Sequence, residues 1–119
     1  MTRDKTIVSL HQMLDHAVEA VAFLGGAGLR QFESDRLTNL AVAHLVEIIG
    51  EAANRISAES QIRYAEIPWR DIVNMRNVIA HGDDVVDLEA VWKVVVEDLP
   101  PLIIALEDIL NEDSHEAPA

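Results

Sequence analysis

The residues best suited to chemistry lie in one short stretch, NMRNVIAHGDD at positions 74–84. Arg76 and His81 are five residues apart, and Asn77 directly follows the arginine. A guanidinium can stabilise charge that develops on phosphoryl oxygens, and an imidazole can move protons near neutral pH. This pair of side chains therefore indicates a candidate site for phosphodiester chemistry.

The stretch is predicted to end a helix that begins near Pro68 and stops at Gly82. At about 100° per residue, Asn77 and His81 would share one face of that helix, with Arg76 on the flank. His81 would be the last residue of the helix, where the helix dipole favours a protonated imidazole. The predicted helix therefore places both candidate groups near one surface.

Both cations also have a purely structural interpretation. A histidine at a helix C-terminus is a favourable terminal residue whatever its function. Arg76 could simply pair with a neighbouring acid such as Asp71. Residue spacing alone leaves the catalytic and the structural interpretations open.

A second polar cluster, of His44, Glu47 and Glu51, recurs at steps of three and four residues on one predicted helix. Such residues could suggest a metal site. A carboxylate-bridged di-iron bundle, however, needs Glu-x-x-His on two helices and a glutamate from each of two others. We find no Glu-x-x-His on the first, third or fourth predicted helix, so we interpret the cluster as a polar helix face. We predict no metal and no other cofactor.

The charge of the chain limits how it could bind RNA. It carries 21 acidic and 9 basic residues among 119, for a formal net charge of −12 and a pI of about 4.6. Such a protein repels nucleic acid at long range, so an RNA-binding role would need a local cationic pocket or a basic partner. The excess acid could equally serve only to keep the surface soluble.

The location of the protein is predicted to be cytoplasmic, with no membrane contact. The chain has no cysteine, which excludes disulfides and cysteine-ligated metals and fits a reducing compartment. Its start lacks the apolar core of a secretion signal, and charges and prolines interrupt its most hydrophobic region.

Hydrophobic periodicity predicts an all-α, up-and-down bundle of four to five helices. The first covers about residues 4–24 and ends at the GGAG sequence, and Ser34 or Asp35 begins the second, which runs to about residue 58. A connector then leads to the third. The second helix should bury a stripe of apolar residues: Leu37, Leu40, Ala41, Leu45, Ile48, Ile49, Ala52 and Ile56.

The last part of the domain is predicted to be helical but irregular. Asp87 should cap the fourth helix, with Glu89 in its first turn. Pro100 and Pro101 interrupt the helical pattern, so this helix should be kinked or broken near residue 99 and should end at about residue 110. We expect one domain over residues 1–110, followed by an acidic, disordered tail over residues 111–119.

The chain resembles the HEPN superfamily, and within it the HepT-like ribonuclease toxins of the type VII HepT/MntA toxin–antitoxin family. The resemblance covers about residues 3–110. Its central signature is Arg-x4-His with a polar residue after the arginine, here Arg76, Asn77 and His81. Three segments in order make it specific: IIGEAANRIS at 48–57, EIPWRDIVNMRNVIAHG at 66–82 and VDLEAVWKVVVEDLPPL at 86–102.

The resemblance implies a HEPN-like fold and a metal-independent endoribonuclease. The 2′-hydroxyl of the RNA would attack the adjacent phosphate and leave a 2′,3′-cyclic end. Arg76 would bind the phosphate and His81 would transfer protons, while Asn77 would orient His81 or contact the phosphate. Glu51 would support the site by positioning Arg76.

The same chemistry favours a homodimer. Cleavage by this route needs one group that accepts a proton and another that donates one, yet the motif supplies a single histidine. Two copies facing each other across a two-fold axis would bring two histidines and two arginines into one cleft. We therefore predict a dimer whose third helices line a shared groove.

One residue departs from the HepT pattern. That branch usually continues His-x-Tyr, and an MntA-like nucleotidyltransferase antitoxin adds AMP to the tyrosine. Here the position is Asp83, and the only tyrosine in the chain is Tyr64. Asp83 would bring negative charge near Arg76 and His81, which would compete with phosphate. The chain is thus predicted to be an RNA-cleaving toxin whose antitoxin does not modify tyrosine or, alternatively, a non-catalytic module that binds a nucleotidyltransferase.

Overall fold

The computed structural model describes residues 3–78 and 86–116. Every regular element in this part of the chain is helical, so the predicted all-α class is confirmed. The elements are α1 (Arg3–Leu24), α2 (Leu29–Ser34), α3 (Arg36–Asn54), α4 (Ala58–Arg63), α5 (Trp69–Asn74), the 3₁₀-helix η1 (Met75–Val78), α6 (Leu88–Lys93), the π-helix η2 (Val94–Asp98) and α7 (Leu99–Glu116).

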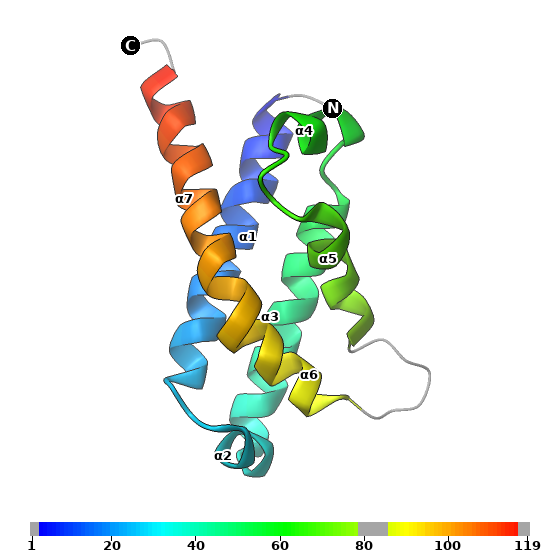
Figure 1. The fold of residues 1–119 in the computed structure, drawn as a ribbon, viewed down its shortest axis with the longest axis vertical. Coiled ribbons are helices and arrows are strands. Elements are labelled where there is room, and N and C mark those ends of the chain that lie inside the picture. The colour runs from blue at the N-terminus through cyan, green and yellow to red at the C-terminus, as the bar shows by residue number, and fades with distance from the viewer. Residues whose placement is uncertain (1–2, 79–85, 117–119) are drawn as a thin grey trace.

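Three long helices, α1, α3 and α7, run up and down the bundle, and the shorter elements cover its ends and one side (Figure 1). Helix α1 packs against both α3 and α7, and the core lies between them. In the described part of the chain, no helix has the length and apolar run that a membrane crossing requires. The largest fully buried side chains include Leu10, Met13, Phe32, Val42, Val46, Ile49, Ile72, Leu99 and Leu106.

The first helix ends where the sequence predicted. Gly25 and Gly26 have φ angles of 59° and 78°, in the left-handed region that favours glycine. The Gly25 amide still donates to the Val21 carbonyl, after which the chain turns away. The short helix α2 follows and buries Phe32, and no strong sequence signal had pointed to it.

The start of α3 confirms one prediction and its buried face corrects another. Asp35 is the residue that caps α3, and its carboxylate accepts hydrogen bonds from the amide and the hydroxyl of Thr38 at 3.1 and 2.8 Å. Leu37 and Leu40, however, are 82% and 46% exposed, so that part of the predicted stripe is wrong. Helix α3 is apolar on more than one side, and packing against α1 selects a different face. That face includes Val42, Ala43, Leu45, Val46, Ile49, Gly50, Ala52 and Ala53.

The predicted connector after α3 contains a helix of its own. Ser57 caps α4 by accepting a hydrogen bond from the Ser60 amide at 3.2 Å, and α3 itself ends at Asn54 instead of about residue 58. The Thr6 and Ser60 hydroxyls lie 3.3 Å apart and join α1 to α4. This short helix therefore closes one end of the bundle.

The third predicted helix is α-helical only in its first part. Pro68 is the N-cap residue of α5, and the α-helix ends at Asn74. A 3₁₀ turn, η1, then carries Arg76 and Asn77. The predicted end at Gly82 lies outside the described residues. Around Arg76 the backbone is thus wound more tightly than in the α-helix that the sequence predicted.

The last helical run is irregular just before its prolines, as predicted. Asp87 caps α6 through a 3.0 Å hydrogen bond from the Ala90 amide. The chain then widens into η2, where the Leu99 amide donates to the Val94 carbonyl. Pro100 and Pro101 are the second and third residues of α7 and follow directly after η2. The helix bends without a break (Figure 1).

The end of α7 corrects the predicted boundary of the tail. The helix continues to Glu116, whereas the sequence predicted an end near residue 110. Residues 111–116 of the predicted disordered tail are therefore helical. Helical periodicity weakens there because the side chains are mostly polar, so hydrophobic periodicity does not predict the extension.

Candidate active site

Arg76 lies on η1, against the C-terminal part of α3 near Gly50. Its side chain is partly exposed. Within residues 3–78 and 86–116, its guanidinium has no hydrogen-bond or ion-pair partner, so the predicted structural pairing with Asp71 is not formed. An arginine with no partner among these described residues could bind an anion.

Helix α3 and η1 approach each other closely at Gly50. A Cβ built on Gly50 would lie 2.7 Å from the backbone nitrogen of Arg76 and 3.1 Å from its Cβ. It would also lie 3.2 Å from the Ile72 carbonyl oxygen. Glycine in a helix interior costs about 0.5–1 kcal/mol relative to alanine. The close approach of Arg76 explains why this position of α3 nevertheless holds a glycine.

Glu51 follows Gly50 and has an exposed side chain. The described contacts include no ion pair between Glu51 and Arg76. Glu51 is adjacent in sequence to Gly50, the α3 residue that lies against Arg76. The supporting role of Glu51 stays a prediction.

Asn77 is exposed. Its side-chain amide donates to the Asn74 side-chain oxygen at 3.4 Å, which is a long hydrogen bond. In a 3₁₀ turn, consecutive residues are about 120° apart around the axis, so Arg76 and Asn77 project in different directions. His81 and Asp83 lie outside the described residues, and their roles remain predictions from the sequence.

The second polar cluster has the character of an exposed helix face. His44 Nδ1 lies 3.9 Å from Glu47 Oε1, and the His44 side chain is 70% exposed. In the part of the chain that the structure describes, no group of three or more histidine, aspartate or glutamate side chains is placed to hold a metal ion. The carboxylate-bridged metal alternative therefore finds no ligand set there.

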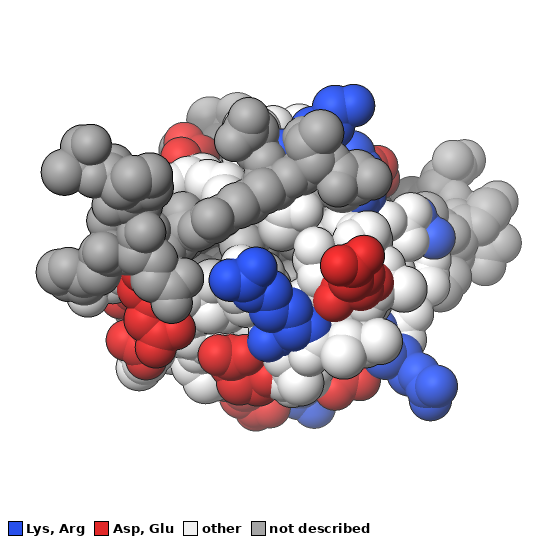
Figure 2. Space-filling view, turned by 90° about the horizontal axis from the view of Figure 1, so that it is seen from above, with Lys and Arg blue, Asp and Glu red and all other residues white. Residues whose placement is uncertain are grey.

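Charge on the end of the bundle beside α4 is mixed (Figure 2). Acidic and basic side chains are interspersed there among uncharged ones, and the visible described surface shows no continuous basic patch. A duplex or single strand of RNA would find no extended positive track on this face.

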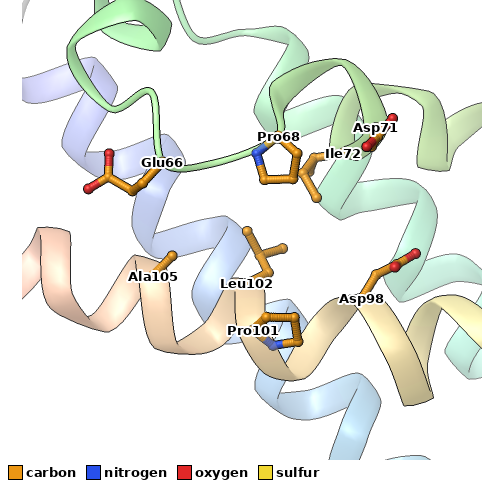
Figure 3. Close-up of a pocket in the computed structure, with 8 residues that line it drawn as sticks. All are labelled: Glu66, Pro68, Asp71, Ile72, Asp98, Pro101, Leu102 and Ala105. Atoms are coloured by element: carbon orange, nitrogen blue, oxygen red, sulfur yellow. The ribbon is translucent and has the colours of Figure 1, made fainter.

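A pocket of about 150 Å³ lies between the start of α5 and the first turns of α7 (Figure 3). Pro68 and Pro101 face each other across it, and three carboxylates, from Glu66, Asp71 and Asp98, stand around it. Burial raises the pKa of Asp98, and the negative charges of Glu97 and Asp71 raise it further. This pocket is chemically unsuited to a phosphate, because acidic groups surround it.

Comparison with known proteins places the chain in a family. The family model described as "Ribonuclease HepT-like" matches residues 13–109, which include α3, η1 and the whole Arg76–His81 motif. The chain belongs to the HepT-like ribonuclease family. No solved structure matches it with significance.

Three relatives illustrate the similarity. A protein named "Probable ribonuclease HepT" from Thermococcus cleftensis is 41% identical over 71 residues, covering 60% of this chain and 64% of the relative. One named "Putative RNase" from Methanocaldococcus jannaschii is 29% identical over 93 residues, covering 78% and 85%. Another of that name, from Caldanaerobacter subterraneus, is 26% identical over 104 residues, covering 84% and 93%.

Sequence reasoning missed the importance of Gly50. From the IGEAA segment, only Glu51 is predicted as a site residue. The available signal was a lone glycine inside an otherwise apolar helix, which often marks a close backbone approach. The partner in that approach, 26 positions along the chain at Arg76, could be found only from the fold.

Proposed function

We propose that this chain is a metal-independent endoribonuclease that acts as the toxin of a toxin–antitoxin pair. The observation that carries the proposal is the family match, which spans the Arg76–His81 motif. The names of the relatives support RNA as the substrate. Arg76 is partly exposed and has no hydrogen-bond or ion-pair partner among residues 3–78 and 86–116, which supports a phosphate-binding role for that residue.

The proposed reaction is an internal transfer at phosphorus. A base removes the proton from the RNA 2′-hydroxyl, whose oxygen attacks the adjacent phosphorus. The bond from phosphorus to the 5′-oxygen breaks, and that oxygen receives a proton, leaving a 2′,3′-cyclic end. Arg76 stabilises the charge on the phosphoryl oxygens, and His81 transfers a proton.

The proposed active unit is a homodimer, because one motif supplies one histidine and the reaction needs two proton transfers. Light scattering after size-exclusion chromatography tests this directly. A mass that stays at one chain, 13.2 kDa, across micromolar concentrations would remove the basis for the two-histidine mechanism.

The proposed partner is an MntA-like nucleotidyltransferase that neutralises the toxin by binding. Transfer of AMP to a tyrosine of the motif is ruled out by sequence, because Asp83 stands at that position. Tyr64, the only tyrosine, is the C-cap residue of α4, and the Arg63 guanidinium lies over its ring at 5.4 Å. Neutralisation by contact therefore fits this chain better than tyrosine modification.

The second candidate function is a non-catalytic module that binds the nucleotidyltransferase. Asp83 favours it, because a carboxylate near Arg76 and His81 would compete with phosphate. Replacing Asp83 with tyrosine separates the two functions. A toxin weakened by Asp83 should cleave RNA faster as Asp83→Tyr, whereas the module should remain inactive with either residue.

The test of the proposed function is expression of the chain alone in bacteria, with His81→Ala as the control. We expect growth arrest and RNA breakdown with the wild-type chain and neither with His81→Ala. Normal growth with intact RNA at matched expression levels would refute the toxin and favour the module.

A further inference from the structure

Gly50 has a steric requirement that the other described glycines lack. Its position inside α3 would suit alanine better in a free helix, yet an added Cβ would meet the Arg76 backbone nitrogen at 2.7 Å. That atom belongs to the backbone, so turning a side chain cannot relieve the contact. Any substitution at Gly50 must therefore move η1, α3 or both.

The contrast with the remaining glycines in the described chain is direct. Gly25 and Gly26 are held by their positive φ angles. Gly28 has an ordinary φ of −73°, and nothing lies within 4 Å of a Cβ built on it. Gly50 is thus the position among these four where a methyl group would push directly on a candidate site residue.

Apart from the contact between η1 and α3, the described residues provide few restraints on the Arg76 side chain. Within the described residues no hydrogen bond or ion pair restrains its guanidinium. The η1 backbone rests on α3 at Gly50, and this contact sets the point from which the Arg76 side chain extends. A shift of about 1 Å in a reacting group can lower a rate by about 100-fold.

We propose that Gly50 is a positioning residue for Arg76. By carrying no side chain, it lets η1 rest directly on α3 and so fixes where the guanidinium meets an RNA phosphate. This inference rests on the proposed ribonuclease function, and it concerns the same site. It predicts that a methyl group added at Gly50, on α3, lowers the cleavage rate by displacing Arg76 on η1, without itself contacting the RNA.

The test compares four variants of the full chain with the wild type: Gly50→Ala, Arg76→Ala, the double variant, and Gly28→Ala as the matched control. Circular dichroism and urea unfolding identify conditions in which each variant is folded. Cleavage rates are then measured with saturating RNA. We expect Gly50→Ala to be slower by about 100-fold, and Gly28→Ala to stay within about twofold of the wild type.

The double variant separates positioning from a general structural role. If Gly50 acts through Arg76, the double variant should be no slower than Arg76→Ala. A folded Gly50→Ala with the wild-type rate would overturn the proposal, as would losses that multiply in the double variant. If Gly50→Ala unfolds in buffer, the same rates are compared in sucrose, which favours the compact state.

A second measurement distinguishes failure of this inference from failure of the ribonuclease function. In the wild-type chain, NMR should show a strong cross-relaxation peak between the Gly50 α-protons and the Arg76 amide proton. Absence of that peak would overturn the proposed positioning contact whether or not the chain cleaves RNA. A strong peak in a chain that cleaves no RNA would overturn the proposed function and leave the packing contact standing.

Discussion

Two places in this bundle bring distant segments together in opposite ways. At the α3–η1 contact, Gly50 meets the Arg76 backbone so closely that there is no room for a methyl group. Between α5 and α7, by contrast, the helices leave a pocket of about 150 Å³ with Pro68 and Pro101 on its walls. The first contact exposes a cation, and the second is surrounded by three carboxylates.

The difference shows how an acidic chain can still offer a phosphate site. With a net charge of −12, the protein as a whole repels RNA, and the acidic pocket adds to that repulsion. A phosphate group is attracted only where nearby cations outweigh the more distant acidic groups. Those few cations therefore have to be held in place at one site. Tight packing under Arg76 would provide that rigidity, while the looser pocket serves no such purpose.

The largest expected effect is on catalysis at the tight contact. Arg76→Ala should reduce RNA cleavage by about 100-fold or more, because it removes the group that stabilises charge on the phosphoryl oxygens. Arg70→Ala, an exposed arginine of the same segment, is the matched control and should stay within about twofold. Equal losses in the two variants would mean that total positive charge matters and the position of Arg76 does not.

The next largest expected effect is on stability, for substitutions that add carbon atoms at the α3–η1 contact and at the pocket between α5 and α7. Gly50→Ala should lower the free energy of unfolding by about 1–3 kcal/mol, because the α3–η1 contact is already full. Ala105→Leu, which adds atoms at the pocket, should change it by only about 0.5 kcal/mol. Urea unfolding at one pH measures both. A Gly50→Ala variant more stable than the wild type would contradict the close contact.

The smallest effect is on the pH dependence of stability, with opposite signs at two aspartates. Hydrogen bonds from Thr38, the backbone amide first, lower the pKa of Asp35, whereas burial and neighbouring acids raise the pKa of Asp98. Asp35 therefore contributes stability above its ordinary pKa that is lost as pH falls through the lowered value. Asp98 disfavours the folded state as pH rises through the raised value.

Two conservative variants measure these signs at pH 7 and again below about pH 3.8. At pH 7, Asp98→Asn should be more stable than the wild type, by about 0.5 kcal/mol or less because solvent screens the charge. Asp35→Asn should be less stable there. Both differences should shrink at the lower pH. A gain from Asp98→Asn that persists at low pH would point to a cause other than charge.

The sequence predicted the parts of the fold that depend on local chemistry. The glycines that end α1 and the caps at Asp35 and Asp87 are local signals, and each lies where predicted. The buried face of α3 was partly wrong, because a helix that is apolar on several sides does not define its own orientation. The exposure of Leu37 is the clearest example.

The candidate site likewise has features that the sequence predicted and features that depend on packing between distant segments. The Arg76–His81 motif was visible in the sequence, and the family match covers it. The 3₁₀ turn under Arg76 and the contact with Gly50 depend on packing between segments far apart in the chain, which periodicity does not report. The pocket at Pro101 was likewise not predictable, because it arises where two helices fail to meet.

The most direct test of the proposed metal-independent cleavage is the chemistry of the cleaved RNA ends. Purified protein is incubated in EDTA with RNA, and separately with the same RNA carrying 2′-O-methyl groups throughout. We predict cleavage of the unmodified RNA with 2′,3′-cyclic phosphate ends, and no cleavage of the 2′-O-methylated RNA. Cleavage of the methylated RNA, dependence on a divalent metal, or ends bearing a free 3′-hydroxyl would contradict it.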